Sequence, residues 1–556
     1  MEKTCFKCQA KFILIDEDEK FREKVALVIK DQKISIPEPT LCEDCRQQKL
    51  LALRNEIALY HRKCDMCKTS IISMFPADSR VHVYCKKCWW GDSWSPLDYG
   101  QDFDFTRPFF EQFNELIEKV PFGHLIIGGE VENCDYTNYL MTSKNCYLIS
   151  SSDYDEDCYY STYIFRSKNC FDCLFVNDSE LLYQGVDCLN CYGSAFLQDC
   201  QNVSDSYFCY DCKGCQNCIG CVGLRNKQYH VMNVKYSKEE YEKKKVEFLG
   251  KNKNFDILRE QFNEFKLKFP HKFAEITGCA DSFGDRLSNC KNAHNCFDLV
   301  EAQDCKNLAL GLKARDCADC VGVPNSELCY QAVASPEDYA LQFCAVTWPR
   351  STYLQYCMFC RMSNNSFGCV SLHKNEYCIL NKQYTKEEYE ELLPKIIEHM
   401  KKTGEYGELF PIEISPFAYN ETVAQDYFPL TREEVIAKGW RWYEDESEKM
   451  YKGPKVEIPE NIANIDEDLC KKILTCEATG KPYKVIPQEL QFYKRMGLPI
   501  PNKCPDQRHK DRMKLRNPRK LWDRKCAKCS KDVKTTFAPE RLEIVCCEEC
   551  YLEQTY

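Results

Sequence analysis

The sequence predicts a multidomain, mainly β protein in which a cysteine-rich module at each end flanks a duplicated parallel β-solenoid with inserted helices. Three observations support this fold class. The stretch from Cys42 to Cys88 recurs without a gap at Cys504 to Cys550, when 462 is added to each residue number. An Asn-Cys or Asp-Cys pair recurs through the middle of the chain, mostly at steps of 12 residues. The end of this array is found again 148 residues further along the chain.

The terminal modules contain pairs of cysteines separated by two residues, and two such pairs supply the four thiolates that a tetrahedral zinc ion needs. The shift of 462 preserves one set completely and matches Cys64, Cys67, Cys85 and Cys88 with Cys526, Cys529, Cys547 and Cys550. Upstream of this set, Cys5, Cys8, Cys42 and Cys45 correspond to Cys476, Thr479, Cys504 and Gln507. The second copy has lost one ligand from each pair together, as expected if all four bind one ion. We therefore predict three structural zinc ions, one for each complete set.

Three details of these sets stay open in the sequence. Cys546 stands beside Cys547 and could replace it as a ligand, although the repeat favours Cys547. Cys476 and Cys504 could recruit His509 for a degenerate metal site, but a buried remnant without a metal is favoured. Redox or catalytic thiols are the remaining alternative, and the closed character of four-cysteine sites disfavours that role.

The first module carries a recognisable pattern, C-x-x-C-x-x-x-F followed by P-x-x-C-x-x-C-R, at Cys5, Cys8, Phe12, Pro39, Cys42, Cys45 and Arg46. This pattern resembles the probable zinc-ribbon, treble-clef-like domain of many uncharacterised bacterial proteins. Over its full length the chain also resembles long, uncharacterised, cysteine-rich proteins of candidate-phyla bacteria, in segments such as Cys88-Trp-Trp and Val545-Cys-Cys-Glu-Glu-Cys-Tyr. The resemblance implies zinc-ribbon or treble-clef modules at both ends and brings no established activity.

The composition favours a protein of a reducing compartment. The chain has 556 residues, 41 cysteines and a net charge of −10. It starts without an apolar leader, and it contains no run of about 18 apolar residues that could span a membrane. Without a secretion signal the thiols should stay reduced, so we expect a cytoplasmic protein that binds metal rather than one that forms disulfides. A secreted protein whose signal has been removed is the alternative.

The middle of the chain has the period of a solenoid. Cysteines recur at positions 134, 146, 158, 170, 188, 200 and 212, and a second array has them at 290, 305, 317, 329, 344, 357 and 369. A fixed short period with strand-forming residues and Asn or Asp corners predicts a parallel β-solenoid. Cysteine is small and apolar enough to stack inside it. Each array leads into a charged helix through a capping box, Ser237 with Glu240 and Thr385 with Glu388.

Two local clusters in the middle invite a chemical interpretation. Cysteines 209, 212, 215, 218 and 221 stand at every third residue, as in some iron–sulfur proteins, but two of them become Ser363 and Ser366 in the second array. Stacked structural thiols are therefore favoured, ahead of an additional zinc and of an iron–sulfur cluster. The acidic loop with Asp153, Asp155 and Asp157 could bind calcium or supply paired catalytic carboxylates. A solvated corner is favoured for this loop.

These patterns divide the chain into eight segments. They are a tandem zinc-ribbon module (1–90), an aromatic docking linker with a helix (91–131), solenoid half 1 (132–236), a helical insertion (237–277), solenoid half 2 (278–384), a helix with a docking strip (385–445), a linker (446–470) and a second, basic zinc module with one degenerate metal site (471–556). The duplication thus covers both the terminal modules and the solenoid.

The second module is strongly basic. Between Lys494 and Lys534 there are 15 Lys or Arg and four Asp, a local charge of +11 that leaves −21 for the rest of the chain. The helix expected after Cys504 carries cations where the first module has apolar residues, which suggests a polyanion partner. The predicted phosphate-contacting residues are Arg508, Lys510, Arg512, Lys514, Arg516, Arg519 and Lys520. A solvated surface balanced by the protein's own acidic body is the alternative.

We therefore expect a non-enzymatic zinc protein that binds RNA, DNA or a ribonucleoprotein through its basic C-terminal module. A scaffold that binds a protein partner on the solenoid is the second hypothesis. A carbohydrate-active solenoid enzyme is the third. No membrane association is expected.

Overall fold

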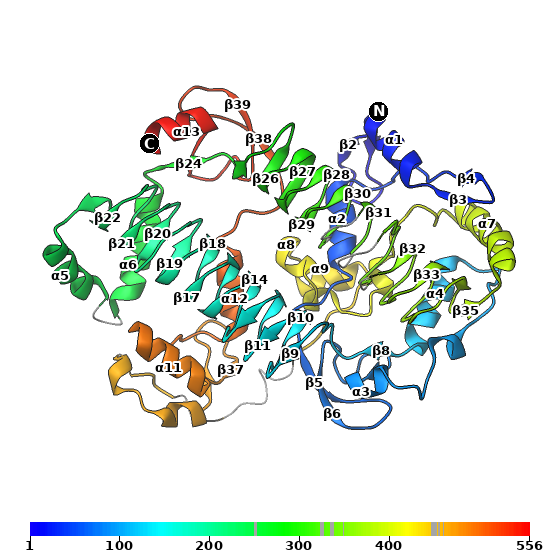
Figure 1. Ribbon diagram of the computed structural model, residues 1–556, viewed down its shortest axis with the longest axis horizontal. Helices are drawn as coiled ribbons and strands as arrows, with labels where there is room; N and C mark the ends of the chain where they lie inside the picture. Colours follow the sequence, from blue (N-terminus) through cyan, green and yellow to red (C-terminus); the bar gives the residue numbers. More distant parts are fainter. Residues whose placement is uncertain are drawn as a thin grey trace.

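The computed structural model describes residues 1–249, 253–322, 327–333, 339–347, 350–445, 453, 456–459 and 461–555. Its middle consists of two parallel β-solenoids, half 1 from β9 to β22 and half 2 from β25 to β34 (Figure 1). The predicted fold class is confirmed, because the protein is mainly β, the solenoid is duplicated, and clusters of cysteines lie near both ends.

The solenoid strands are short, and most pair in parallel with a strand one turn away. Half 1 contains β9 (Val131–Glu132), β10 (Asn138–Leu140), β11 (Ser143–Lys144), β12 (Ser150–Ser152), β13 (Asp155–Glu156), β14 (Thr162–Phe165), β15 (Lys168–Phe171), β16 (Leu174–Asn177), β17 (Glu180–Tyr183), β18 (Val186–Leu189), β19 (Tyr192–Gln198), β20 (Tyr207–Tyr210), β21 (Gln216–Ile219) and β22 (Gln228–Val231). Half 2 contains β25 (Ile276–Thr277), β26 (Phe283–Ser288), β27 (Lys291–Val300), β28 (Gln303–Lys306), β29 (Ala309–Leu312), β30 (Arg315–Ala318), β31 (Glu327–Tyr330), β32 (Thr352–Gln355), β33 (Asn364–Phe367) and β34 (Cys378–Ile379).

The elementary unit of each half is a triplet of residues. Every third residue adopts the left-handed conformation, as at Leu148 (φ 51°) and Ser151 (φ 50°), and the residue after it is buried in the core. Four triplets make one 12-residue turn, which is the predicted period. Amides within each triplet donate to both neighbouring turns, for example Tyr147 N to Cys158 O and Leu148 N to Asp135 O, each at 3.1 Å. This ladder offsets the cost of the left-handed backbone, about 1 to 2 kcal/mol per residue.

Cysteine thiols fill the interior of both halves. A typical inward Sγ donates to two carbonyl oxygens, one two residues before it and one nine residues after it. Cys158 Sγ, for example, lies 3.4 Å from both Glu156 O and Ser167 O. The five cysteines at 209, 212, 215, 218 and 221 occupy successive sides of this interior and are at most 1% exposed. The interpretation of these residues as stacked structural thiols is confirmed.

Helices precede and follow each half. Half 1 follows α4 (Phe109–Lys119), and half 2 follows α5 (Lys238–Leu249) and α6 (Lys253–Lys266), whereas α7 (Lys386–Thr403) comes after half 2. Both predicted capping boxes are present at α5 and α7, where Ser237 and Thr385 accept from the backbone N–H of Glu240 and Glu388 at 3.2 Å. The segment after α7 contains η2 (Ile412–Ile414), η3 (Tyr419–Glu421), α8 (Ala424–Tyr427) and α9 (Arg432–Ala437).

Part of the predicted linker, residues 446–452, 454–455 and 460, lies outside the described residues. Its later part contains η4 (Ile462–Asn464) and η5 (Glu467–Lys471). There Ile465 and Leu469 are buried in the cluster that α11 (Pro487–Met496) forms against half 1.

The terminal modules consist of small hairpins and short helices. The first has β1 (Glu2–Thr4), β2 (Lys11–Ile13), α1 (Asp16–Val25), β3 (Leu27–Ile29), β4 (Gln32–Ile34), α2 (Glu43–Leu51), β5 (Tyr60–Lys63), β6 (Ser70–Ser73), β7 (Val83–Tyr84) and α3 (Lys86–Trp89). The second has β36 (Leu474–Thr475), β37 (Pro482–Tyr483), α11, α12 (Pro505–Met513), β38 (Trp522–Lys525), β39 (Asp532–Thr535), β40 (Ile544–Cys546) and α13 (Glu548–Thr555).

The duplication extends further than the sequence analysis detected. Residues 111–115 of α4 and 260–264 of α6 share the sequence Glu-Gln-Phe-Asn-Glu, so a shift of 149 relates these helices. Equivalent residues of the two solenoid halves differ by 147 in number near the start of the halves. The difference becomes 148 after one turn of half 2 that has 13 residues, in which Ala345 pairs with Met358. Together with 462 for the terminal modules, these shifts relate most elements of one copy to elements of the other.

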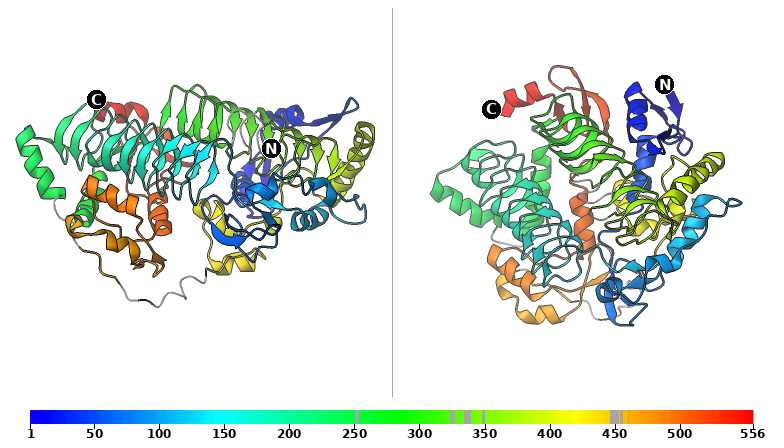
Figure 2. Two further views of the ribbon diagram at one scale, coloured as in Figure 1. Left: turned by 60° about the horizontal axis from the view of Figure 1, so that its bottom comes forward. Right: turned by 45° about the vertical axis from the view of Figure 1, so that its right-hand side comes forward.

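Each terminal module bridges the two halves. In the first module, Arg46 of α2 contacts Asp319 of half 2 at 3.0 Å, while β7 pairs with β8 (Phe122–Gly123), directly before half 1. In the second, Arg508 of α12 contacts Asp172 of half 1 at 3.1 Å, while β40 pairs with β24 (Pro270–Lys272), directly before half 2. Arg46 and Arg508 differ by 462 and Asp172 and Asp319 by 147, so the same buried ion pair forms twice. Figure 2 shows α12, in orange, between the two halves.

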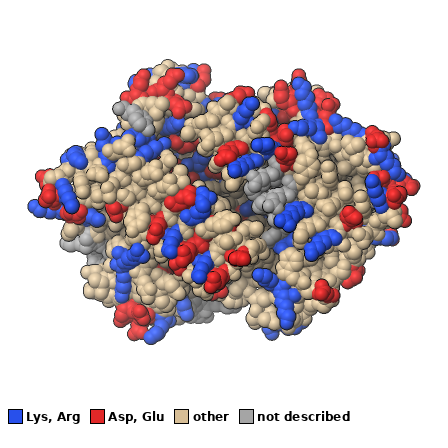
Figure 3. Space-filling view, viewed as in Figure 1, with Lys and Arg blue, Asp and Glu red and all other residues tan. Residues whose placement is uncertain are grey.

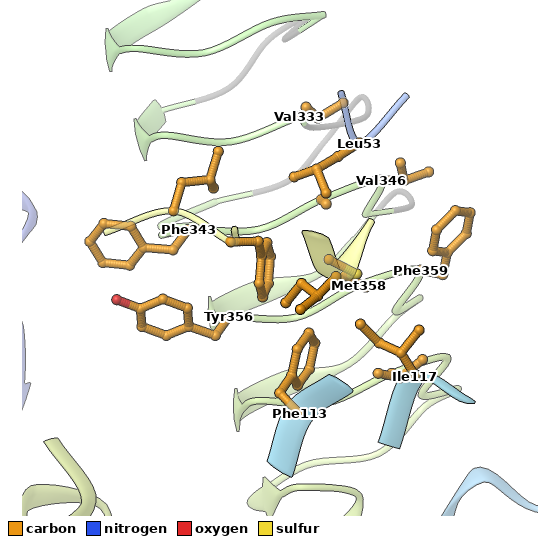
Figure 4. Close-up of a cluster of buried hydrophobic side chains, with 14 of the residues drawn as sticks. Leu53, Phe113, Ile117, Val333, Phe343, Val346, Tyr356, Met358 and Phe359 are labelled. Carbon is orange, nitrogen blue, oxygen red and sulfur yellow. The ribbon is translucent and has the colours of Figure 1, made fainter. Parts of the chain in front are cut away.

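The helices cross between the halves in the same way. Phe113 and Ile117 of α4, which precedes half 1, lie beside Met358 and Phe359 of half 2 (Figure 4). Conversely, α6 precedes half 2 but packs on half 1, where the rings of Phe262 and Phe208 are 6.1 Å apart. Each half is therefore covered by the helix that leads into the other half.

A cluster of buried charges joins the halves at the centre. Arg516 contacts Asp187 of half 1 at 3.0 Å and also Asp298 of half 2, which Arg519 contacts at 2.9 Å. Arg286 of half 2 contacts Asp187 at 3.1 Å, so the two halves also meet directly. Burial would raise the pKa of Asp298, but Arg516 and Arg519 lower it to about 2. This carboxylate therefore stays ionised between its two arginines.

We expect Asp172→Asn to lower the free energy of unfolding by about 3 to 5 kcal/mol, because it removes the buried carboxylate that Arg512 contacts and leaves Arg508 with Glu489 alone. Asp178→Asn is the matched control. Asp178 also occupies a left-handed corner of half 1, but its ion pair with Arg166 is exposed, so the loss should stay below about 1 kcal/mol. Urea unfolding followed by circular dichroism measures both changes, and equal losses would contradict the importance of the buried pair.

Candidate metal centres

Three sets of four cysteines converge in the structure. Within each set the four Sγ atoms all lie within 4.8 Å of one another, in Cys5, Cys8, Cys42 and Cys45, in Cys64, Cys67, Cys85 and Cys88, and in Cys526, Cys529, Cys547 and Cys550. One Sγ–Sγ distance in each set is 3.5, 3.7 and 3.6 Å respectively. A tetrahedral ion with metal–sulfur bonds of about 2.3 Å separates its ligands by about 3.8 Å. Each set could therefore hold one metal ion of the size of zinc.

Local backbone structure explains why the cysteines converge. The first pair of each set stands in the turn of a hairpin, followed by a residue in the left-handed conformation, Gln9 (φ 63°), Lys68 (φ 62°) or Ser530 (φ 62°). The second pair opens a helix, α2, α3 or α13. Helix N-termini and free N–H groups stabilise thiolates. Accordingly, the amides of Cys85 and Cys547 donate to the Sγ of Cys64 and Cys526 at 3.2 and 3.3 Å.

These surroundings lower the pKa of at least one thiol in each set. Hydrogen bonding by Cys45 lowers the pKa of Cys42 to about 4, and hydrogen bonding by Thr69 lowers that of Cys67 to about 6. Burial raises the pKa of Cys526, but backbone hydrogen bonds with Cys529 and Cys547 bring it down to about 6. Each set therefore presents an ionised sulfur at neutral pH, which is the form that binds metal.

The fourth, degenerate set keeps the hairpin turn but not the ligands. Cys476 N donates to Lys481 O at 2.8 Å, as Cys526 N does to Lys531 O in the complete site. Thr479 Oγ1 lies 3.9 Å from Cys504 Sγ, in the place of a second thiol. His509 Nε2 lies 3.8 Å from Asp426. The metal-capable groups found among the described residues do not include these side chains.

The repeat also selects the correct residue of the Cys546–Cys547 pair. Cys547 belongs to the third set, as the shift of 462 predicts. Cys546 lies outside the set, and its Sγ accepts from Gln554 Nε2 at 3.9 Å.

The basic segment is placed differently from the prediction. Arg508, Arg512 and Arg516 are 4, 3 and 9% exposed, and together with Arg519 they contact carboxylates of the same chain. These four arginines are therefore engaged within the chain, and phosphate contact through them stays a prediction. Guanidinium groups bind carboxylates in a fork geometry, and the aspartates of the solenoid corners supply them internally.

The three lysines of the predicted interface, Lys510, Lys514 and Lys520, are exposed. Lys514 lies 3.8 Å from Asp511, and Lys520 lies 3.8 Å from Asp44 of the first module. Cationic and anionic side chains are interspersed over the face drawn in Figure 3.

The acidic loop of half 1 is part of the solenoid wall. Asp155 is 2% exposed and accepts from Ser167 N at 2.9 Å, while Asp153 accepts from Thr142 N at 2.7 Å. Burial raises the pKa of Asp155 to about 9. The expectation of a solvated corner is therefore wrong for Asp155, because its position in the triplet directs it inward. The metal-capable groups of the described residues include none of the three aspartates.

A comparison with models of known protein families and with curated proteins found no match to this chain. Among the described residues, none of the helices is both long and apolar enough to cross a membrane.

Cys526→Ser should lower the bound metal from three ions per chain to two, because three thiolates hold zinc far more weakly than four. Cys476→Ser changes the equivalent position of the degenerate set and should leave three ions bound. Elemental analysis of the purified, dialysed proteins measures the metal per chain. Loss of an ion from the Cys476 variant would show that the degenerate set binds metal after all.

Asp155→Asn should stabilise the protein at alkaline pH. The carboxyl of Asp155 has a pKa near 9 when folded and about 4 when unfolded, so the wild-type protein loses stability as the pH rises between these values. The asparagine variant lacks this loss. We expect its advantage to grow by about 2 to 3 kcal/mol between pH 6 and pH 8 in urea unfolding. A difference that does not depend on pH would contradict a neutral, buried Asp155.

Proposed function

We propose that this protein is a non-enzymatic, zinc-dependent scaffold. Three structural zinc ions shape the terminal modules, the modules hold the two solenoid halves in one arrangement, and the assembled solenoid surface binds a protein partner. The observation that carries this proposal is that each terminal module forms a buried ion pair with one half and pairs with the strand directly before the other half.

The small size of the terminal cores supports a dependence on zinc. The buried cluster around the first set consists only of Cys5, Phe12, Leu14, Leu41, Cys42 and Cys45. So little apolar surface does not stabilise a fold by itself, and a four-thiolate zinc site contributes folding free energy directly. Thiolates prefer zinc among the common divalent ions without redox chemistry. A reducing, cytoplasmic environment suits the free thiols of this chain.

Exposed apolar side chains on the solenoid support a protein partner. Val300 and Leu312 are paired on adjacent turns of half 2, and both are exposed. Tyr339 and Tyr353 are likewise exposed on adjacent turns, with ring centroids 5.8 Å apart. Stacked apolar and aromatic side chains of this kind are typical of protein-binding surfaces.

Nucleic-acid binding through the second module is the second candidate function. Three exposed lysines, Lys510, Lys514 and Lys520, still favour it, but the four arginines of the segment are engaged within the chain. Because fewer cationic side chains are free to contact phosphates, fewer counterions would be released from the nucleic acid, and the electrostatic contribution to its binding would be weaker.

We expect labelled single-stranded RNA and duplex DNA to bind with dissociation constants above about 10 μM at 150 mM salt, in the range of non-specific association. The same value is expected for the triple variant Lys510→Glu, Lys514→Glu, Lys520→Glu. Fluorescence anisotropy at 50 and 300 mM salt measures both. Submicromolar, salt-dependent binding that the triple variant abolishes would replace the scaffold by a nucleic-acid-binding function.

A further inference from the structure

The duplicated architecture makes equivalent positions comparable, and one junction differs sharply between the copies. In the first copy, the first module, α4, β8 and half 2 meet in a hydrophobic core (Figure 4). Leu53, Ile117, Val346 and Met358 lie together there, and all four are buried. In the second copy, the second module, α6, β24 and half 1 meet around a polar cavity of about 40 Å³.

The same backbone positions carry opposite chemistry. Six buried or partly buried apolar residues of the first copy correspond to six polar residues that line the cavity in the second. The residue numbers differ by 149 in the helix and strand, by 462 in the module and by 147 or 148 in the solenoid. Ile117, Phe122, Ile126, Val81, Val346 and Met358 become Lys266, His271, Glu275, Glu543, Asp199 and Tyr210. Three further lining residues are the same in both copies, since Leu53, Asn55 and Phe75 correspond to Leu515, Asn517 and Phe537.

The fold itself does not require these polar groups. The first copy packs the same elements with aliphatic and aromatic side chains, and burying ionisable groups in their place costs free energy. Some of the polar groups neutralise each other, since Asp199 contacts Arg286 at 2.7 Å and Glu543 contacts Arg541. Three other groups at the cavity, Lys266, Glu275 and His271, form no ion pair with a described residue, although Asp199 and Glu543 partly offset the burial of Lys266, and Lys213 and Lys272 that of Glu275.

His271 is the most deeply buried of the three. It is 2% exposed, its Nδ1 lies 3.0 Å from the hydroxyl of Tyr210, and its Nε2 is buried with no hydrogen-bond partner in the described part of the chain. Burial lowers the pKa of His271 to about 4, so the imidazole is neutral. An unpaired polar atom at such depth costs about 1 to 3 kcal/mol unless a ligand or water satisfies it.

Lys266 and Glu275 are the other two groups. Lys266 Nζ donates to Gln198 Oε1 at 3.2 Å, and no ion pair joins it to a carboxylate of the described residues. The carboxylate of Glu275 likewise has no ion pair with a described cation, and burial and the nearby Asp199 raise its pKa. The cavity thus offers one cation, one carboxylic group and one neutral imidazole.

We propose that this cavity binds a small zwitterion of the amino-acid type. Lys266 receives its carboxylate, Glu275 its ammonium group, and His271 Nε2 a hydrogen bond. An anion alone would pair only with Lys266 and a cation alone only with Glu275, whereas a zwitterion pairs with both. The cavity has space for about three water molecules, so only a small molecule or the head group of a longer one fits. This site is independent of the scaffold function.

Calorimetric titration of the full-length, zinc-loaded protein tests the site, with glycine, L-alanine and β-alanine as probes. Acetate and methylammonium, which carry only one of the two charges, are the ligand controls. We expect at least one zwitterion to bind at least tenfold more tightly than either control. Binding of none of the three zwitterions up to 10 mM would overturn the proposal, and so would equal binding of the single-charge controls.

The first copy supplies the decisive variant. Lys266→Ile with His271→Phe installs the residues that Ile117 and Phe122 provide there, so it should abolish binding while keeping or raising the melting temperature. Lys268→Ile, on an exposed neighbouring position, should bind like the wild type. If the double variant does not fold, Glu275→Gln serves instead and should weaken zwitterion binding at least tenfold. Undiminished binding in these variants would overturn the assignment.

Discussion

The arrangement of this protein depends on buried arginine–aspartate pairs between the terminal modules and the solenoid. Burying a guanidinium group in an interface costs free energy unless a carboxylate lies within ion-pair distance. Each pair therefore determines which solenoid turn a module helix contacts. Arg46 with Asp319 and Arg508 with Asp172 make this selection twice, at positions that the internal repeat relates. Charge matching thereby adds selectivity to an interface that is also apolar, since the first module, α4 and half 2 share one hydrophobic core.

The crossed contacts convert two solenoids into one body. Each half is entered through a helix that packs on the other half, and each module bridges both. The triplet backbone makes such contacts possible, because its left-handed corners are often Asn or Asp, and the carboxylate of an Asp corner can turn outward to an arginine. Asp172, Asp187 and Asp298 are all corners of this kind. The same residues that close the turns therefore also bind the modules.

The sequence predicted those features that depend on the spacing of residues along the chain. Paired C-x-x-C spacings located all three metal-capable sets, the gapless repeat chose Cys547 over Cys546, and the 12-residue period predicted the solenoid. Charge alone could not predict whether Arg508, Arg512 and Arg516 are buried or exposed. A buried arginine in an ion pair and a solvated arginine are indistinguishable in a sequence. Two missed signals were present. The cysteines at 209 to 221 displayed the triplet period itself, and Glu-Gln-Phe-Asn-Glu at 111–115 and 260–264 marked the repeat of the helices.

The crossed topology sets an order of events during synthesis. Arg46 emerges early, yet its partner Asp319 lies 273 residues later in the chain. The first module therefore has to persist undocked until more than half of the polypeptide has left the ribosome. The second module meets the opposite situation, since half 1 is complete before Arg508 is made. A nascent chain stalled before residue 319 would accordingly leave Arg46 of α2 without its buried carboxylate partner, and any metal ion held by the first two cysteine sets would act before that partner exists.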